Sequence, residues 1–162
     1  MTQAKAAFAV RRMRLEDLEE VLAVEKAAFQ HPWSGDLFTK ELEHEWSTIL
    51  IAQEPARSGA GARIVGFLIY WLVHDEVHIL NVATAPAERR RGVARALLAE
   101  ACQRATAADC ALLTLEVRRS NTGALALYQQ LGYQQVGVRT GYYAAENEDA
   151  IVMTLTLRDR GF

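Results

Sequence analysis

Cysteine is scarce in this chain, and long apolar runs are missing altogether. Only two cysteines, Cys102 and Cys110, occur in the 162 residues. Both lie in an apolar, helix-like stretch, so we interpret them as reduced core residues. No stretch reaches the roughly eighteen apolar residues of a membrane-spanning helix, and the opening MTQAKAAFAVRRMR lacks the long apolar segment of a secretory signal. We therefore expect a cytoplasmic protein that does not span a membrane.

An excess of charge of one sign is also absent. The chain carries 18 Lys and Arg against 20 Asp and Glu, a formal net charge of -2, which argues against general nucleic-acid binding. This length favours one core, so we predict a single domain over residues 1–162. Repeats and low-complexity tracts are missing, and the segment EPARSGAGA, Glu54 to Ala62, is interpreted as a hairpin loop rather than a domain boundary.

Several catalytic motifs are missing as well. The sequence contains no GxxxxGKS or GxxxxGKT run and no GxGxxG after a strand, so nucleotide hydrolysis and dinucleotide redox chemistry are not indicated. No serine or cysteine has a neighbouring histidine–acid pattern, so covalent catalysis is not indicated either. In HDEVH, an extended backbone would place His74 and His78 about 13 Å apart, too far to share a metal ion. We therefore predict no metal site.

What the sequence does contain is hydrophobic periodicity of both kinds. Ser34 and Asn121 are good helix caps, and Gly132 is a good C-terminal helix stop. The predicted helices are Leu15–Phe29, Ser34–Glu45, Gly92–Ala108 and Asn121–Leu131; the predicted strands are Phe8–Met13, Ile49–Gln53, Ile64–Val73, Val77–Thr84, Leu112–Val117, Tyr133–Arg139 and Ile151–Leu157. This order predicts an α/β fold, with a mixed central sheet of about seven strands flanked by about four helices. The first three strands can form a meander, and the later strand–helix–strand units need right-handed crossovers.

The densest cluster of positive charge lies between a predicted strand and a predicted helix. In VATAPAERRRGVARALL, residues 82–98, four arginines surround one glycine: Arg89, Arg90, Arg91, Arg95 and Gly92. A helix N-terminus offers free N–H groups and partial positive charge, and Gly92 lets the backbone approach a ligand closely. Arginines at this end of a helix are unfavourable unless an anion is present, so we interpret the segment as a pyrophosphate site. A solvated basic turn is the alternative.

These residues and their surroundings resemble the GNAT family of acetyltransferases. Arg89–Ala94 resembles the family's Arg/Gln-x-x-Gly-x-Gly/Ala pyrophosphate loop, with Ala94 where many members have glycine. LEVRRSNTGALALYQQLGY, residues 115–133, resembles the end of the GNAT fold. HPWS at residues 31–34 resembles the RimI branch, as does the pattern of Arg139, Tyr142, Tyr143, Asp149, Ala150 and Met153. The resemblance spans Val10 to Leu157 and implies a GNAT fold.

The resemblance also implies a function and a set of site residues. The RimI branch acetylates the N-terminal alanine of small-subunit ribosomal protein 18, with acetyl-CoA as cosubstrate, so it implies a protein substrate. From the net charge and the lack of long apolar runs we expect no nucleic-acid or membrane partner. Glu116 matches the general base, acting directly or through water, and Tyr128 matches the general acid to the CoA thiolate. The implied CoA-binding residues are Val82, Ala83, Thr84, Arg90, Arg91, Gly92, Val93, Ala94, Arg95 and Asn121. Among them, residues 82–84 match the strand that pairs with the pantetheine arm. Trp33, Tyr142 and Tyr143 are candidates for the wall of the peptide entry.

Considered without the resemblance, these residues also have structural explanations. Glu116 could be an exposed or arginine-paired strand end, and Tyr128 a core tyrosine with its hydroxyl satisfied. Asn121 serves as a helix cap in either case. Two other functions stay open: a GNAT enzyme for a lysine side chain or a small amine, and a catalytically silent acyl-CoA-binding module. The presence of both Glu116 and Tyr128 counts against the silent module.

Overall fold

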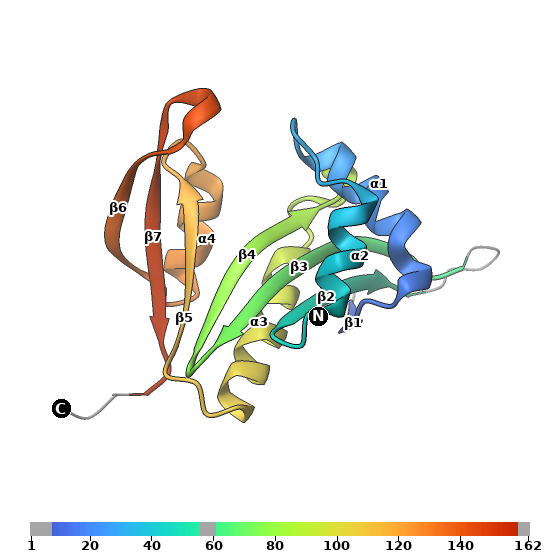
Figure 1. The fold of residues 1–162 in the computed structure, drawn as a ribbon, viewed down its shortest axis with the longest axis horizontal. Coiled ribbons are helices and arrows are strands. Elements are labelled where there is room, and N and C mark those ends of the chain that lie inside the picture. Colours follow the sequence, from blue (N-terminus) through green and yellow to red (C-terminus); the bar gives the residue numbers. More distant parts are fainter. Residues whose placement is uncertain (1–7, 56–60, 159–162) are drawn as a thin grey trace, which may run out of the picture. The chain divides into compact units, whose positions relative to one another are not determined.

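The structure is a computed structural model that describes residues 8–55 and 61–158. Within these residues, seven strands form one sheet in the order β1-β2-β3-β4-β5-β7-β6 (Figure 1). The strands are β1 (Ala9–Arg12), β2 (Ser47–Glu54), β3 (Arg63–Val73), β4 (Glu76–Thr84), β5 (Leu112–Arg118), β6 (Gln134–Tyr143) and β7 (Glu148–Thr156). The same residues form the helices α1 (Leu18–Ala28), α2 (Gly35–Glu43), α3 (Val93–Ala107) and α4 (Thr122–Gln130), and the short 3-10 turns η1 (Leu15–Asp17), η2 (Pro86–Glu88) and η3 (Ala144–Glu146). The predicted mixed sheet and four helices are confirmed.

The chain divides into two compact units. Unit 1 comprises Met1–Tyr70 and Asn81–Ala101, and unit 2 comprises Trp71–Leu80 and Cys102–Phe162. The single domain expected over residues 1–162 stays a prediction. Among the helices of the described residues, none is both long and apolar enough to cross a membrane.

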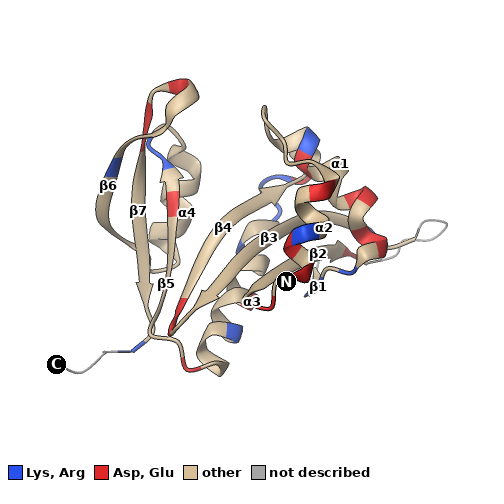
Figure 2. Cartoon of the chain, in the orientation of Figure 1, with Lys and Arg blue, Asp and Glu red and all other residues tan. Residues whose placement is uncertain are grey.

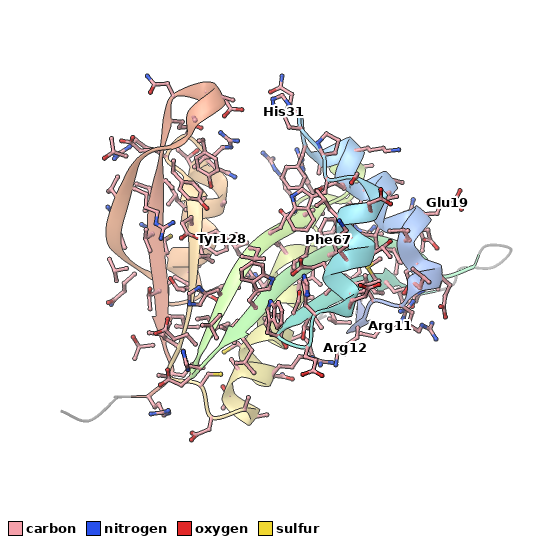
Figure 3. The ribbon with its side chains drawn as sticks, viewed as in Figure 1. Arg11, Arg12, Glu19, His31, Phe67 and Tyr128 are labelled. Carbon is pink, nitrogen blue, oxygen red and sulfur yellow. The ribbon has the colours of Figure 1, made fainter. Side chains whose placement is uncertain are left out.

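The main core of unit 1 lies between β2–β3 and the helices α1 and α2. Phe67 of β3, labelled in Figure 3, is fully buried. It meets Phe38 of α2 edge-on, with ring centroids 5.5 Å apart, and both belong to one buried cluster with Val21 and Val24 of α1. The side chain of Ser34 begins α2 by accepting a hydrogen bond of 3.3 Å from a backbone N–H, as predicted. Apolar burial at helical spacing therefore fixes both helices on this face.

The opposite face of β3 is covered by α3, and one glycine makes the close approach possible. A Cβ atom on Gly66 would lie 2.6 Å from Val93 Cγ1 and 2.7 Å from the carbonyl oxygen of Ala83. Figure 1 shows α3 behind β3, with α1 and α2 in front. Only glycine at this position lets the first turn of α3 and the end of β4 lie so near β3.

Unit 2 contains β5, β6 and β7 together with the end of β3 and the first residues of β4. β5 pairs in parallel with β4 over Glu76–Ile79, and pairs antiparallel with β7 along its whole length. β7 in turn pairs antiparallel with β6, with register shifts between Gln135 and Gly137 and again between Arg139 and Tyr143. β7 therefore lies between β5 and β6, although β6 precedes it in the sequence.

Helix α4 of unit 2 has both of the end signals predicted for it. Asn121 Oδ1 accepts a hydrogen bond of 3.2 Å from the backbone N–H of Ala124, and Gly132 follows the helix with a φ of 98°. Positive φ is costly for residues that carry a Cβ, so glycine suits this stop. Tyr128 and Tyr133 pack together, with ring centroids 5.6 Å apart.

The predicted elements agree with the structure except at their ends. The first predicted helix is a 3-10 turn followed by α1, because Asp17 closes a separate turn by accepting from the backbone N–H of Arg14 at 2.7 Å. The predicted loop Glu54–Ala62 lies partly outside the described residues. Both cysteines are free; Cys110 is buried and Cys102 half-buried.

Candidate active site

The basic segment of unit 1 is a tight turn that leads directly into α3. Arg90 and Gly92 both have positive φ, 67° and 85°, and Gly92 accepts the first hydrogen bond of the helix at 3.0 Å, from Ala96. A non-glycine residue in the left-handed region is uncommon and calls for a local cause. Left-handed residues placed next to others turn successive backbone N–H groups towards one point, the arrangement that binds phosphate oxygens. In Figure 2 the Lys and Arg positions of the chain are coloured blue on the ribbon.

The arginines of this segment have different surroundings. Arg91 Nη1 lies 3.1 Å from Glu54 Oε1 and also forms an ion pair with Glu88. Arg63 Nη2 contacts the same two carboxylates, at 2.8 Å and 2.6 Å. Glu54 and Glu88 are only 5% and 7% exposed. Hydrogen bonds to Glu88 and Glu54 hold the pKa of Arg91 above its usual value, so Arg91 is anchored within unit 1, although both Arg90 and Arg91 are exposed.

The other residues predicted to bind CoA in this unit could contact a ligand mainly through their backbone groups. Val93 and Ala83 are buried, at 2% and 3% exposure, so their side chains belong to the core. Val82, Thr84 and Ala94 are half-buried, and Arg95 is exposed on the first turn of α3. The chain after β4 is tied to β3 by a hydrogen bond of 2.8 Å from the Ala85 N–H to the Val65 carbonyl. This part of unit 1 can therefore offer N–H groups to a ligand without moving its core.

In unit 2, Glu116 lies on β5 opposite Val152 of β7. Its side chain is 27% exposed, and Arg139 Nη1 lies 3.6 Å from its Oε1. The ion pair expected as one structural explanation of Glu116 is therefore present, although both partners keep contact with solvent. A partly exposed carboxylate can exchange this arginine for another cation or for water, so the contact does not prevent it from accepting a proton.

Tyr128 of α4 is deeply buried and keeps its proton. It is 8% exposed, and burial, with a smaller contribution from Tyr143, raises its pKa to about 12. The hydroxyl is therefore a neutral donor throughout the physiological range. Figure 3 labels Tyr128 in unit 2. Asn121, at the start of the same helix, uses Oδ1 for the cap, so the donor Nδ2 of its amide is the group that could serve a ligand.

Tyr142 and Tyr143 form an aromatic pair at the end of β6. Their rings meet edge-on with centroids 5.1 Å apart. A guanidinium lies over each ring: that of Arg139 is 5.4 Å from the Tyr142 centroid, and that of Arg118 is 3.9 Å from the Tyr143 centroid. Tyr142 is 49% exposed. Since Arg139 contacts both Glu116 and Tyr142, the predicted base and the predicted peptide wall are neighbours within unit 2.

Trp33, the third predicted wall residue, belongs to unit 1. Its ring lies 5.5 Å from that of Phe38, and its backbone N–H donates to Glu25 Oε2 at 3.2 Å. Glu25 was not predicted to be part of a site, yet it is only 1% exposed. The available signal is its position four residues after Val21, which places a charged side chain on the apolar face of the helix.

The predicted site residues are thus shared between the units. Unit 1 contains Trp33 and the candidate CoA-binding residues other than Asn121; unit 2 contains Glu116, Asn121, Tyr128, Tyr142 and Tyr143. Among the residues that the structure describes, no group of three or more His, Cys, Asp and Glu side chains could hold a metal ion. His78 Nε2 instead lies 3.1 Å from Glu76 on its own strand.

Comparison with known proteins gives one consistent family. Residues 15–133 match the family model described as "Acetyltransferase (GNAT) family". The chain is 32% identical to the [ribosomal protein bS18]-alanine N-acetyltransferase of Escherichia coli (strain K12) over 143 residues, 87% of this chain and 92% of that one. The crystal structure of the Escherichia coli ribosomal-protein-S18-alanine N-acetyltransferase superposes with a TM-score of 0.82 at 30% identity, covering 96% and 97% of the two chains. The Arabidopsis thaliana NAA60 structure in complex with acetyl-CoA, at 18% identity, shares the fold with a TM-score of 0.83 over 93% and 99%. Because the family model matches residues 15–133 and relatives at 30% identity or more cover most of the chain, the chain belongs to the GNAT family of acetyltransferases.

Proposed function

We propose that this protein is an acetyl-CoA-dependent N-α-acetyltransferase that acts in the cytoplasm on a protein N-terminus, the N-terminal alanine of small-subunit ribosomal protein 18. The observation that carries the proposal is the placement of Glu116 in unit 2. It is a partly exposed carboxylate that shares Arg139 with the exposed aromatic ring of Tyr142. A carboxylate can take the proton of a peptide amine, and the neighbouring aromatic ring can contact the rest of the peptide. The names of the relatives, which match over nearly the whole chain, support the same substrate.

The anion loop of unit 1 supports acetyl-CoA as the cosubstrate. Backbone N–H groups around Gly92 and at the start of α3 would bind the pyrophosphate, with Arg90 and Arg95 supplying full positive charge. Residues 82–84 of unit 1 would pair with the pantetheine arm through their backbone. Asn121 is the candidate CoA-binding residue of unit 2, with Nδ2 as its available donor. The acetyl-CoA complex of a protein with the same fold is consistent with this assignment.

The chemistry requires the N-terminal ammonium to lose two protons, one before its nitrogen attacks and one as the amide forms, and it requires the departing sulfur to gain one. An N-terminal ammonium has a reference pKa of about 7.7–8.0, so a modest base such as Glu116 suffices to remove its proton, directly or through water. The free amine nitrogen then forms a bond to the thioester carbonyl carbon. As the tetrahedral intermediate collapses, the nitrogen releases its second proton to water, the C–S bond breaks, and the Tyr128 hydroxyl donates to the departing sulfur as the general acid and is restored by a proton from water. The amide forms without a covalent enzyme intermediate.

The pKa of Tyr128 decides when a proton can move from its hydroxyl to the departing sulfur. A phenol with a pKa of about 12 holds its proton more tightly than a thiol with a pKa of about 8.5. Transfer to a fully formed thiolate would therefore be uphill. Tyr128 acts best as a hydrogen-bond donor to the sulfur while negative charge develops there, which lowers the barrier without complete transfer in advance.

The direct test is acetyl transfer from labelled acetyl-CoA to a panel of N-terminal hexapeptides. The panel contains alanine-starting ribosomal peptides, the same peptides with a blocked N-terminus, and N-blocked lysine peptides. We expect label only on peptides with a free N-terminal alanine. Label on the N-blocked lysine peptides would contradict the proposal in favour of a side-chain acetyltransferase. Binding of CoA without transfer to any amine would point to the silent module.

A further inference from the structure

Glu25 is a fully buried carboxylate that the proposed chemistry does not use. It lies on α1 and is 1% exposed. Its two oxygens accept from two separate segments: Oε2 from the Trp33 backbone N–H at 3.2 Å, and Oε1 from Asn81 Nδ2 at 3.3 Å. All three residues belong to unit 1. The carboxylate therefore joins the segment between α1 and α2 to β4.

A carboxylate buried in this way lowers the stability of the fold. Burial raises the pKa of Glu25, and the hydrogen bonds from Trp33 and Asn81 offset only part of that effect. A buried carboxyl group without full compensation destabilises the fold, and an apolar side chain would fill the same space at lower cost. Both partners donate in the structure, and the two carboxylate oxygens of Glu25 satisfy both at once. By accepting from both groups, Glu25 fixes the distance between the Trp33 backbone N–H and the Asn81 side chain.

The two segments that Glu25 joins both carry predicted site residues. Trp33 is the candidate wall of the peptide entry, and its ring is held further by Phe38 at 5.5 Å. Asn81 directly precedes residues 82–84, the candidate pantetheine segment. An error of about 1 Å in such a placement can cost as much as a hundredfold in rate.

We propose that Glu25 is a positioning residue that sets the place of the peptide wall relative to the cofactor strand, through its paired hydrogen bonds to Trp33 and Asn81. This inference rests on the proposed function, since it assigns to Trp33 a part in binding the acceptor peptide. Glu25 itself touches neither substrate nor cofactor in this role.

The test exchanges donors and acceptors between Glu25 and Asn81. Glu25→Gln places an amide NH2 against the Asn81 NH2, so this hydrogen bond is lost as long as the Asn81 amide keeps its orientation. Asn81→Asp places two carboxylates face to face, which disfavours ionisation of both. The double variant Glu25→Gln/Asn81→Asp restores the pattern, because the new amide donates to the new carboxylate and still accepts from the Trp33 N–H. We expect each single variant to raise the KM for the peptide about tenfold, equivalent to one lost hydrogen bond, with the Kd for acetyl-CoA within about twofold of wild type. The double variant should recover to within about threefold.

A matched control separates positioning from stability. Val21 lies one turn before Glu25 on α1 and is fully buried, so Val21→Ala lowers the melting temperature without changing any hydrogen bond. It should leave the KM for the peptide unchanged. If Val21→Ala raises this KM as much as Glu25→Gln does at equal loss of stability, or if the double variant is no better than the singles, the inference is wrong.

A second readout does not depend on activity. With Trp46 and Trp71 replaced by phenylalanine, the fluorescence of Trp33 reports on its surroundings alone. Glu25→Gln should increase quenching of Trp33 by acrylamide, and the double variant should reverse the increase. Altered quenching together with no acetylation of any peptide would contradict the proposed function and leave Glu25 as an anchor of Trp33. Normal quenching in every variant of an active enzyme would contradict the role of Glu25 alone.

Discussion

Arg91 Nη1 lies 3.1 Å from Glu54 Oε1, so an arginine at the centre of the predicted phosphate loop is held by the end of β2. Glu88 binds the same guanidinium, and Arg63 bridges both carboxylates. Neither Glu54 nor Glu88 has much contact with water, so each depends on these arginines for compensation of its charge. The loop is therefore anchored before any ligand arrives, and its arginines divide into an anchor and candidate phosphate ligands.

This division predicts different effects for neighbouring arginines. Arg91→Gln should lower the melting temperature of the CoA-free protein by at least about 2 °C, because Glu54 and Glu88 then each lose an ion pair with a guanidinium. Arg90→Gln should leave it within about 1 °C, since Arg90 is exposed.

The double variant Arg90→Ala/Arg95→Ala should weaken CoA binding more than it slows saturated turnover, and should reduce the salt dependence of binding. Calorimetric titration at several salt concentrations measures this. Unchanged CoA affinity in the double variant would reject the anion site.

The close packing at Gly66 gives a second prediction. Gly66→Ala brings a Cβ atom to 2.6 Å from Val93 Cγ1 and 2.7 Å from the Ala83 carbonyl oxygen, distances that force β4 or α3 to move. We expect a loss of about 1–3 kcal/mol in the free energy of unfolding, measured by denaturant titration, and weaker CoA binding. Gly123→Ala is the matched control, because nothing lies within 4 Å of a Cβ atom there. Equal stability of the two variants would show that β3, β4 and α3 leave room for a Cβ atom at position 66.

Much of this fold could be predicted because its signals are local. Asn121 and Gly132 mark the two ends of α4 through hydrogen bonding and φ preferences of single residues, and the structure has both features. The place of β7 between β5 and β6 could not be predicted, because strand order depends on which distant segments pair. The register shifts of β6 are equally a result of pairing rather than of the strand's own sequence.

The same distinction applies to the candidate site. The anion loop could be predicted because its arginines conflict with the dipole of the following helix, a local contradiction that an anion would resolve, and it stays a prediction. The anchoring of Arg91 could not, because Glu54 lies far earlier in the sequence and gave no signal beyond a loop residue. Glu25 gave a weak signal, a charge on an apolar helix face, but its partners Trp33 and Asn81 come from two other segments.

The assignment of Glu116 as general base predicts a pH-dependent defect. Glu116→Gln keeps the shape of the side chain and removes its basicity, so kcat should fall by roughly 10²–10⁴-fold near neutral pH, with normal acetyl-CoA binding. The loss should shrink as the pH rises past the pKa of the amine, about 7.7–8.0, since free amine then forms unaided. The pH profiles of kcat for the two proteins test this. A variant that is nearly as active as wild type at a pH of about 6.5–7, below the amine pKa, would show that Glu116 is not the base.

Burial of Tyr128 predicts loss of stability in alkali. Its pKa is raised from 10.0 to about 12 in the folded protein, so between these pH values the unfolded chain releases a proton that the folded chain keeps. The free energy of unfolding should therefore fall as the pH rises through this window, by about 1.4 kcal/mol per pH unit for this group. Tyr128→Phe should remove that part of the slope in denaturant titrations. Tyr133→Phe should reduce the slope likewise, because burial raises the pKa of Tyr133 in the same direction.

Tyr128 also offers the sharpest test of how the thiolate leaves. Tyr128→Phe keeps the ring that packs on Tyr133 and removes only the hydroxyl, so acetyl-CoA should bind nearly normally while kcat falls by roughly 10²–10⁴-fold. Because the hydroxyl stabilises negative charge on the sulfur, the defect should depend on the leaving group. An acetyl thioester of a more acidic CoA analogue needs less stabilisation, and the ratio of wild-type to variant kcat should be smaller with it. Tyr133→Phe, a buried tyrosine of the same unit, should show no such dependence on the leaving group. If the ratio is the same for both thioesters, Tyr128 stabilises the fold or orients the cofactor, and the proton reaches the sulfur from another donor.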